Sequence, residues 1–97
     1  MERAMRKVYW RKKALNAFQM QKFWYMINKD EQFVASYQEN IEKTITQIEF
    51  MPSIGLSIKN LDGRAYRKIL AHPKSWIYYW YDNNELHILD IRSSVMK

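Results

Sequence analysis

Four cations in the second half of the chain could stabilise a negatively charged transition state: Arg64, Arg67, Lys68 and Lys74. Cleavage of RNA through its 2′-hydroxyl needs such cations for the phosphorane, a base for the hydroxyl and an acid for the leaving oxygen. The side chains that could serve as acid or base are His72, His87, Glu85 and Asp90. The alternative is that the cations form a solvated edge that keeps a small protein soluble. A regular strand would point Arg67 and Lys68 to opposite faces, so both interpretations stay open.

The two histidines also have structural interpretations. His72 precedes Pro73 in a predicted turn, where a solvated side chain needs no further role. His87 lies on a predicted strand, a setting typical of a packed, hydrogen-bonded histidine. Neither residue is therefore assigned to catalysis by its type alone.

The sequence lacks the residues that several other classes of reaction require. The chain has no Cys and two His, which excludes a thiol nucleophile and a disulfide framework and leaves few ligands for a metal. No Ser-His-Asp order and no glycine-rich phosphate loop is present. We therefore expect neither a metal nor a cofactor. A Cys-free chain is typical of the reducing cytosol, and no apolar stretch approaches about 20 residues, so we expect a cytoplasmic protein without a membrane partner.

The net charge favours an acidic partner, either nucleic acid or protein. The chain has 97 residues, which predicts a single domain, and a formal charge of +6. Six basic residues and Glu2 lie within the first 13 positions, so this segment contributes +5 (six minus one). It predicts either a contact with phosphate or an acidic protein, or a basic arm, disordered over residues 1–5.

Large aromatic side chains alternate along residues 75–81. Trp76, Tyr78 and Trp80 share one face of this predicted strand, and Ile77, Tyr79 and Tyr81 share the other. One face must pack on helices, and the other then presents aromatics outward. Such a surface can stack on bases, but it is more typical of a protein interface, which we favour. The aromatics of the first half, Trp10, Trp24 and Tyr25, are expected in the core.

The periodicity predicts helices first and strands afterwards. Residues 8–10 favour a short strand, and a helix is expected over 11–28. Asp30 can cap a second helix, which Pro52 ends. The period then changes to two, with strands expected over 56–59, 65–71, 75–81 and 85–91 and turns between them. This order predicts an α+β fold: an N-terminal strand and an antiparallel helical hairpin on a twisted, mainly antiparallel sheet of about four strands.

Several short motifs in this order resemble the RelE/ParE superfamily of toxins from type II toxin–antitoxin systems. Val8-Tyr9-Trp10 resembles the family's opening strand, and residues 51–55 (Met-Pro-Ser-Ile-Gly) resemble its stop after the second helix. Residues 63–70 (Gly-Arg-Ala-Tyr-Arg-Lys-Ile-Leu) resemble its "Tyr-Arg" strand. Residues 77–79 and 86–91 resemble its last two strands. The resemblance covers about residues 6–97 and implies an antitoxin as partner, in a toxin–antitoxin hetero-oligomer.

The resemblance implies two branches with different targets. RelE-like members cut messenger RNA on the ribosome with basic residues on the sheet and a C-terminal Arg, Tyr or His. Arg67 and Lys68 match basic positions, but Trp76 stands where an Arg is usual, and Arg92 matches the terminal Arg only with a short gap. ParE-like members lack this set and poison DNA gyrase. We therefore expect a ParE-like, non-enzymatic toxin; the alternatives are a metal-independent endoribonuclease of RelE type and a non-toxic basic binding module or degenerate toxin.

The resemblance and the charge together give a set of candidate site residues. Weak catalytic candidates for the nuclease alternative are Arg67, Lys68, His72 and Arg92. Residues expected to bind the target or the antitoxin are Arg64, Arg67, Lys68, Trp76, Tyr78, Trp80 and Arg92.

Overall fold

The computed structural model describes residues 6–71 and 74–93, and within them the helices and strands lie close to where the sequence predicts them. The order of the elements is β1 (Lys7–Trp10), α1 (Lys12–Asn28), α2 (Glu31–Phe50), a 3₁₀ turn (Pro52–Ile54), β2 (Leu56–Leu61), β3 (Arg64–Ala71), β4 (Ser75–Tyr81) and β5 (Glu85–Ser93). The α+β prediction is confirmed. His72, which falls between β3 and β4 in the sequence, lies outside the described residues.

The described residues form a sheet of five strands in the order β1-β5-β4-β3-β2. Strands β2 to β5 form an antiparallel meander, and β1 adds to its far edge parallel to β5, with Trp10 beside Ile88. About four strands were predicted, so the observed sheet is one strand wider. The fifth arises because β1 joins the meander by pairing with the last strand, a contact between opposite ends of the chain.

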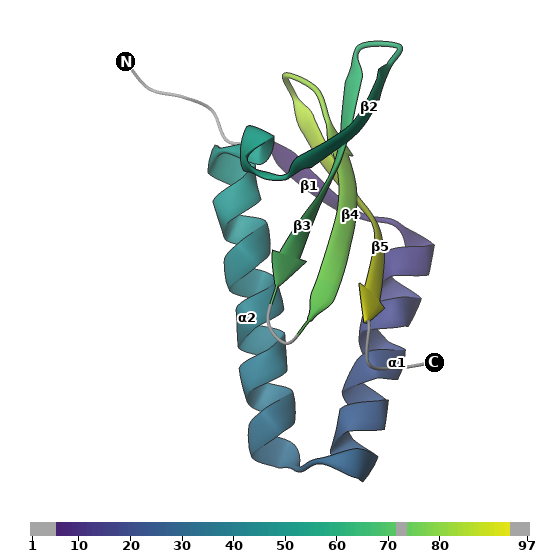
Figure 1. Cartoon of the computed structure of the whole chain (residues 1–97), viewed down its shortest axis with the longest axis vertical. Coiled ribbons are helices and arrows are strands. Elements are labelled where there is room, and N and C mark those ends of the chain that lie inside the picture. The colour runs from purple at the N-terminus through teal and green to yellow at the C-terminus, as the bar shows by residue number, and fades with distance from the viewer. Residues whose placement is uncertain (1–5, 72–73, 94–97) are drawn as a thin grey trace.

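The helices run antiparallel, side by side, and both cover the same face of the sheet (Figure 1). The contacts of α1 are mainly with β5, and α2 lies against β3. The core between helices and sheet is apolar and aromatic, consisting of Ala14, Phe18, Tyr25, Tyr37, Ile41, Ile45, Ile48, Ala71, Ile77, Tyr79, Leu86, Ile88 and Ile91. Neither helix is long and apolar enough to cross a bilayer, in the part of the chain that the structure describes.

The two helices differ in how well their sequence fits one buried face. In α2, buried residues recur at helical spacing, and the Asp30 side chain caps the helix by accepting a 2.8 Å hydrogen bond from the Phe33 amide. In α1, apolar residues lie on both sides: Tyr25 is buried, whereas Trp24 is exposed. The prediction that Trp24 is a core residue is therefore wrong. Helical rotation of 100° per residue moves it off the face that Tyr25 occupies.

The close approach of Gly55 to the sheet links the end of α2 to β4. A Cβ atom at this position would collide with the Tyr79 hydroxyl and lie 2.9 Å from the Lys68 carbonyl oxygen. The Tyr79 hydroxyl donates a 2.6 Å hydrogen bond to the Pro52 carbonyl oxygen. Only glycine leaves room for this buried bond, which ties the 3₁₀ turn to the middle of the sheet.

A bulge in β5 decides which of its side chains face the helices. The pairing with β4 shifts between Tyr78, which lies opposite Asp90, and Tyr79, which lies opposite Ile88. Leu89 is the extra residue. Because of it, Ile91 joins Ile88 under the helices, and Arg92 moves to the opposite face, which we name the outer face.

Candidate functional site

The alternation in β4 confirms that Trp76, Tyr78 and Trp80 share a face, and it is the outer one. Ile77 and Tyr79 are fully buried under the helices. On the outer face Trp76 and Tyr78 are half-buried, whereas Trp80 is only 4% exposed. Burial of a large ring on a face without helices requires other side chains to cover it.

Aromatic and cationic groups from the two neighbouring strands, β3 and β5, cover Trp80. The His87 ring stacks on it with centroids 4.1 Å apart and planes 11° from parallel. Tyr9 stacks on His87 in turn, at 4.7 Å and 17°. The Arg64 guanidinium lies 4.2 Å from the Trp80 ring centroid, and Tyr66 packs beside it at 6.4 Å. Trp80 therefore belongs to a packed stack, which leaves little of its ring for a ligand.

Both nitrogens of His87 have partners. Nε2 lies 2.8 Å from a Glu85 carboxylate oxygen, and Nδ1 lies 3.3 Å from an Arg11 guanidinium nitrogen. A neutral ring that donates from Nε2 and accepts at Nδ1 satisfies both contacts. This arrangement matches the packed, hydrogen-bonded interpretation of His87, and it also engages Glu85, another candidate base.

Further along the outer face, Lys68 and Arg92 flank Tyr78 from the two neighbouring strands. The Lys68 ammonium lies 4.7 Å from the Trp76 ring centroid and 5.9 Å from that of Tyr78. The Arg92 guanidinium lies 5.3 Å from the Tyr78 centroid. The structure therefore brings together four of the predicted residues, Lys68, Trp76, Tyr78 and Arg92. We name them the cation–aromatic cluster.

Asp90 is bound at the margin of this cluster. It accepts a 2.9 Å hydrogen bond from the Arg92 Nε, and the Lys13 ammonium lies 3.7 Å from the same carboxylate oxygen. This hydrogen bond and the negative charge of Asp90 raise the pKa of the Arg92 guanidinium. Asp90 therefore holds Arg92 in place as a permanent cation beside Tyr78.

Arg67 lies apart from the cluster, on the helix side of β3. Its guanidinium donates a 2.7 Å hydrogen bond to the Gly55 carbonyl oxygen, and its buried Nε has no hydrogen-bond partner within the described residues. Arg67 pairs with Tyr79, whereas Lys68 pairs with Tyr78, so the adjacent cations face opposite sides. Arg64 is separate as well, because it lies on Trp80. The predicted cations thus divide among three environments.

Tyr9, Tyr66 and Arg11 contribute to the outer face, although the sequence analysis did not include them among the candidate site residues. Tyr66 alternates with Lys68, and this spacing could have identified it. Tyr9 and Arg11 reach His87 only because β1 pairs in parallel with β5, with Tyr9 beside His87. No local pattern in the sequence predicts that pairing.

Two solved structures resemble this architecture over nearly their whole length. A chain of the chromosomal ParDE TA system from P. aeruginosa covers 92% of this chain and 96% of its own, with a TM-score of 0.73 and 14% identity. A chain of the YoeB dimer from Staphylococcus aureus covers 92% of this chain and 97% of its own, with a TM-score of 0.54 and 18% identity. The chain has the RelE/ParE fold. No protein-family model and no curated protein matches it in sequence.

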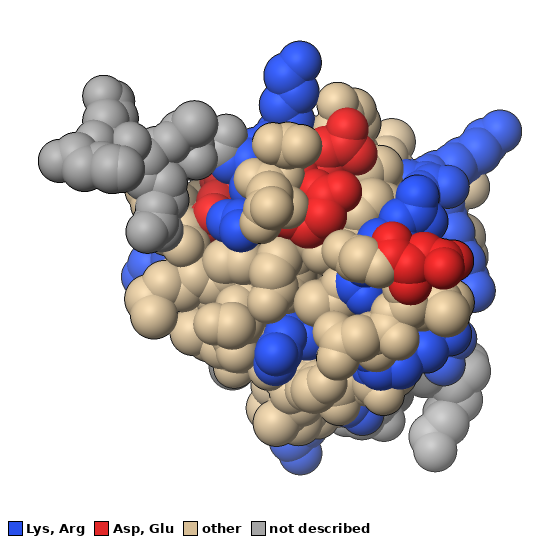
Figure 2. All heavy atoms as spheres, turned by 90° about the horizontal axis from the view of Figure 1, so that it is seen from above, with Lys and Arg blue, Asp and Glu red and all other residues tan. Residues whose placement is uncertain are grey.

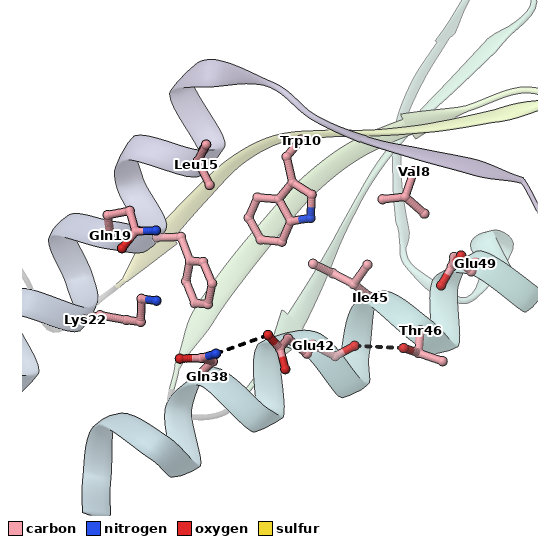
Figure 3. A pocket seen from close by; sticks show the side chains of 11 residues that line it. Val8, Trp10, Leu15, Gln19, Lys22, Gln38, Glu42, Ile45, Thr46 and Glu49 are labelled. Atoms are coloured by element: carbon pink, nitrogen blue, oxygen red, sulfur yellow. Dashed lines mark hydrogen bonds between the residues drawn. The ribbon is translucent and has the colours of Figure 1, made fainter. Parts of the chain in front are cut away.

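The RelE/ParE fold of this chain also carries an open groove between β1, α1 and α2 (Figure 3). The groove has a volume of about 640 Å³, and its apolar surface includes Val8, Trp10, Phe18 and Ile45. On the α2 side, Gln38 donates a 3.3 Å hydrogen bond to the Glu42 carboxylate. The groove is thus an apolar depression with a polar margin, on the helical side of the molecule.

Charges of both signs lie close together at one end of the molecule. Figure 2 looks onto the end that carries the β2–β3 and β4–β5 turns, where acidic side chains gather in two groups with Lys and Arg around them. From this side no continuous positively charged surface is seen, of the kind that binds the phosphates of a nucleic acid. Within residues 6–71 and 74–93, no three His, Asp or Glu side chains come together as a metal site would require.

Proposed function

We propose that this chain is the toxin of a type II toxin–antitoxin module, that it acts in the cytoplasm by binding a cellular protein, and that a cognate antitoxin neutralises it. The RelE/ParE fold supports the toxin class, and the similar ParDE chain comes from a toxin–antitoxin system. The proposed target is of the DNA gyrase type, and the proposed complex with the antitoxin is a hetero-oligomer.

The observation that carries the choice of protein binding over catalysis is the engagement of the titratable groups on the outer face. Within the described residues, His87 is bound by Glu85 and Arg11, and Asp90 is bound by Arg92. General acid–base catalysis needs such groups within reach of the substrate and able to exchange a proton. Aromatic rings bordered by cations instead suit a partner protein, whose carboxylates and apolar side chains they would bind.

A ribosome-dependent mRNA endonuclease is the second candidate, and the cation–aromatic cluster favours it. Lys68 and Arg92 lie on either side of Tyr78, so a phosphate above that ring could contact both. Their side chains would stabilise a phosphorane without a metal. The cluster therefore supplies the cations of that mechanism, and a base and an acid would have to come from elsewhere.

Induced expression tests the toxin proposal. The chain is expressed in a bacterial host alone and with the neighbouring reading frame, and growth is measured. Growth arrest that the neighbouring product relieves, together with co-purification of the two proteins, is expected. Normal growth with a salt-sensitive complex would instead indicate a degenerate toxin that binds only its antitoxin.

The target is tested separately with purified protein. Inhibition of DNA supercoiling by gyrase is expected if the target is of the ParE type. Codon-dependent cuts in messenger RNA, mapped by toeprinting on translating ribosomes, would establish the nuclease instead. Replacement of Lys68 and Arg92 by Met should weaken whichever of these activities uses the cluster.

A further inference from the structure

Strand β2 is an unusually open edge of the sheet. Among the strands of residues 6–71 and 74–93 it pairs only with β3, and all six of its residues are exposed. Leu56, Ile58 and Leu61 are exposed by 58%, 48% and 50%. Edge strands are ordinarily protected by charges, bulges or covering elements, because their free N–H and C=O groups accept another strand. Here one lysine, Lys59, and one irregularity between Ser57 and Lys59 are the protective features.

Exposed apolar side chains also occur just outside β2. Phe50, Met51 and Ile54, which lead into the strand, are each about half exposed, and so is Leu70 at the end of β3. Exposed apolar side chains close to one another in the chain, as at residues 50–61, are typical of an interaction site where they gather on one surface. The edge therefore offers both unpaired backbone and apolar surface to the same partner.

The register of the hairpin tells which side chains an added strand would meet. Leu56 lies opposite Lys68, Lys59 opposite Tyr66 and Leu61 opposite Arg64. Because Arg64, Tyr66 and Lys68 alternate along β3, the side chains of Leu56, Lys59 and Leu61 share one face. The Lys59 ammonium lies 5.1 Å from the Tyr66 ring centroid, which confirms that these two residues are on the same side. An incoming strand thus meets apolar, cationic and apolar positions in turn.

The charge around the edge indicates which charge a partner would carry. Residues 55–71 contain four cations, Lys59, Arg64, Arg67 and Lys68, and one acid, Asp62, which gives +3 (four minus one). Cross-strand pairs of opposite charge stabilise a sheet, and like charges destabilise it. We propose that β2 binds an extended acidic segment of a partner protein as a sixth strand, with a carboxylate opposite Lys59 and apolar side chains opposite Leu56 and Leu61.

The geometry of the β2–β3 turn identifies the backbone groups of β2 that an added strand would bind. Asp62 and Gly63 have positive φ values of 53° and 75° and form a two-residue turn between the paired Leu61 and Arg64. A turn of this type is closed by a hydrogen-bonded pair, and pairs along an antiparallel ladder alternate. The N–H and C=O of Asn60 therefore point away from β3, toward the open edge, where a sixth strand would bind them.

Peptide binding to the full chain tests this surface. The probe is a fluorescent nine-residue peptide in which Val, Glu and Val stand at alternate positions among Thr and Ser; a second peptide has Lys in place of Glu. We expect the Glu peptide to bind about five- to tenfold more tightly by fluorescence anisotropy at low salt, and amide exchange of β2 to slow. Equal affinities, or no binding of the Glu peptide up to about 1 mM, would overturn the proposal.

Asn60→Pro removes the outward N–H, and Asn60→Ala is its matched control. The Pro variant should bind the Glu peptide about tenfold more weakly, and the Ala variant should bind it like the original chain. If Asn60→Pro unfolds the hairpin, a Glu peptide N-methylated at alternate amides makes the same test with the unaltered protein. Undiminished binding of that peptide would contradict strand addition. None of these results depends on whether the chain is toxic.

Discussion

The imidazole of His87 and the indole of Trp80 lie face to face, 4.1 Å apart and 11° from parallel, on adjacent strands of the outer face. With Tyr9 on the other side of His87, they form a stack that joins β1, β5 and β4. This stack and the cation–aromatic cluster divide the outer face into a packed part and a more accessible part.

The stack should contribute to stability through ring packing more than through its polar contacts. We expect His87→Ala to lower the free energy of unfolding by about 1–3 kcal/mol, because it uncovers both neighbouring rings. His87→Phe keeps a ring between Tyr9 and Trp80 and should lose less than half as much. Urea unfolding followed by Trp fluorescence measures both. Equal losses would mean that the bonds to Glu85 and Arg11, rather than the rings, stabilise this part of the sheet.

Arg67 and Lys68 should respond differently to the same substitution. Arg67→Met leaves the Gly55 carbonyl oxygen without its 2.7 Å donor, so the free energy of unfolding should fall by about 1–3 kcal/mol. Lys68→Met removes a cation from the outer face and should change the free energy of unfolding by less than about 0.5 kcal/mol. Thermal or urea unfolding of the two variants makes the comparison. A reversed order would show that the two faces of β3 are assigned incorrectly.

The cation–aromatic cluster should matter for the target rather than for folding. Lys68→Met and Arg92→Met are each expected to weaken binding of the target by about 1 kcal/mol or more, with growth inhibition reduced accordingly. Lys43→Met, which removes an exposed cation from α2, is the matched control and should leave both unchanged. Full toxicity of the double variant Lys68→Met with Arg92→Met would place the target surface elsewhere, for instance at the groove of Figure 3.

Gly55 should be intolerant of a side chain because of Tyr79. Gly55→Ala is expected to cost about 1–3 kcal/mol of unfolding free energy, since its Cβ meets the Tyr79 hydroxyl and the Lys68 carbonyl. In a Tyr79→Phe background the cost should be smaller, because one of the two obstacles is gone. A double-mutant cycle in urea measures the coupling. Additive effects would mean that the backbone, not the hydroxyl, limits the space.

Tyr79 should also make stability fall in alkaline solution. Burial is the main cause that raises its pKa to about 12, and burial likewise raises the pKa of Tyr37. Between pH 10.0, the pKa of Tyr79 in the unfolded chain, and its higher pKa in the folded chain, the folded state binds more protons. The contribution of Tyr79 to the free energy of unfolding is therefore complete below pH 10.0 and is lost as the pH rises above it. Urea unfolding at increasing pH should show this decrease, and Tyr79→Phe should reduce its slope. An unchanged slope would assign the effect to Tyr37 alone.

Local patterns in the sequence predict most of the elements. The period of α2, its Asp30 cap and its end before Pro52 are local features, and so is the alternation of β4. Helix and strand periods depend only on nearby residues, which is why the order of elements and the α+β class could be predicted. The helical hairpin follows from its short connection.

The candidate site depended on contacts between distant parts of the chain. The pairing of Tyr9 with His87 joins residues from the two ends of the chain, and loop closure over such a length leaves no local signal. Both faces of β4 carry large aromatics, so the alternation could not tell which face the helices cover. Only packing against Ile41, Ile45 and their neighbours decided it.

Arg92 shows most clearly the difference between what local sequence patterns predict and what distant contacts decide. Strict alternation from Leu86 and Ile88 would put Arg92 under the helices with them. The extra residue Leu89 reverses the alternation, which keeps Ile91 in the core and turns Arg92 toward Tyr78. The sequence by itself determined the strands, the turns and the kinds of side chain available. The tertiary structure decided which of them meet, because strand register is fixed by burial and pairing across the whole sheet rather than by neighbours in the chain.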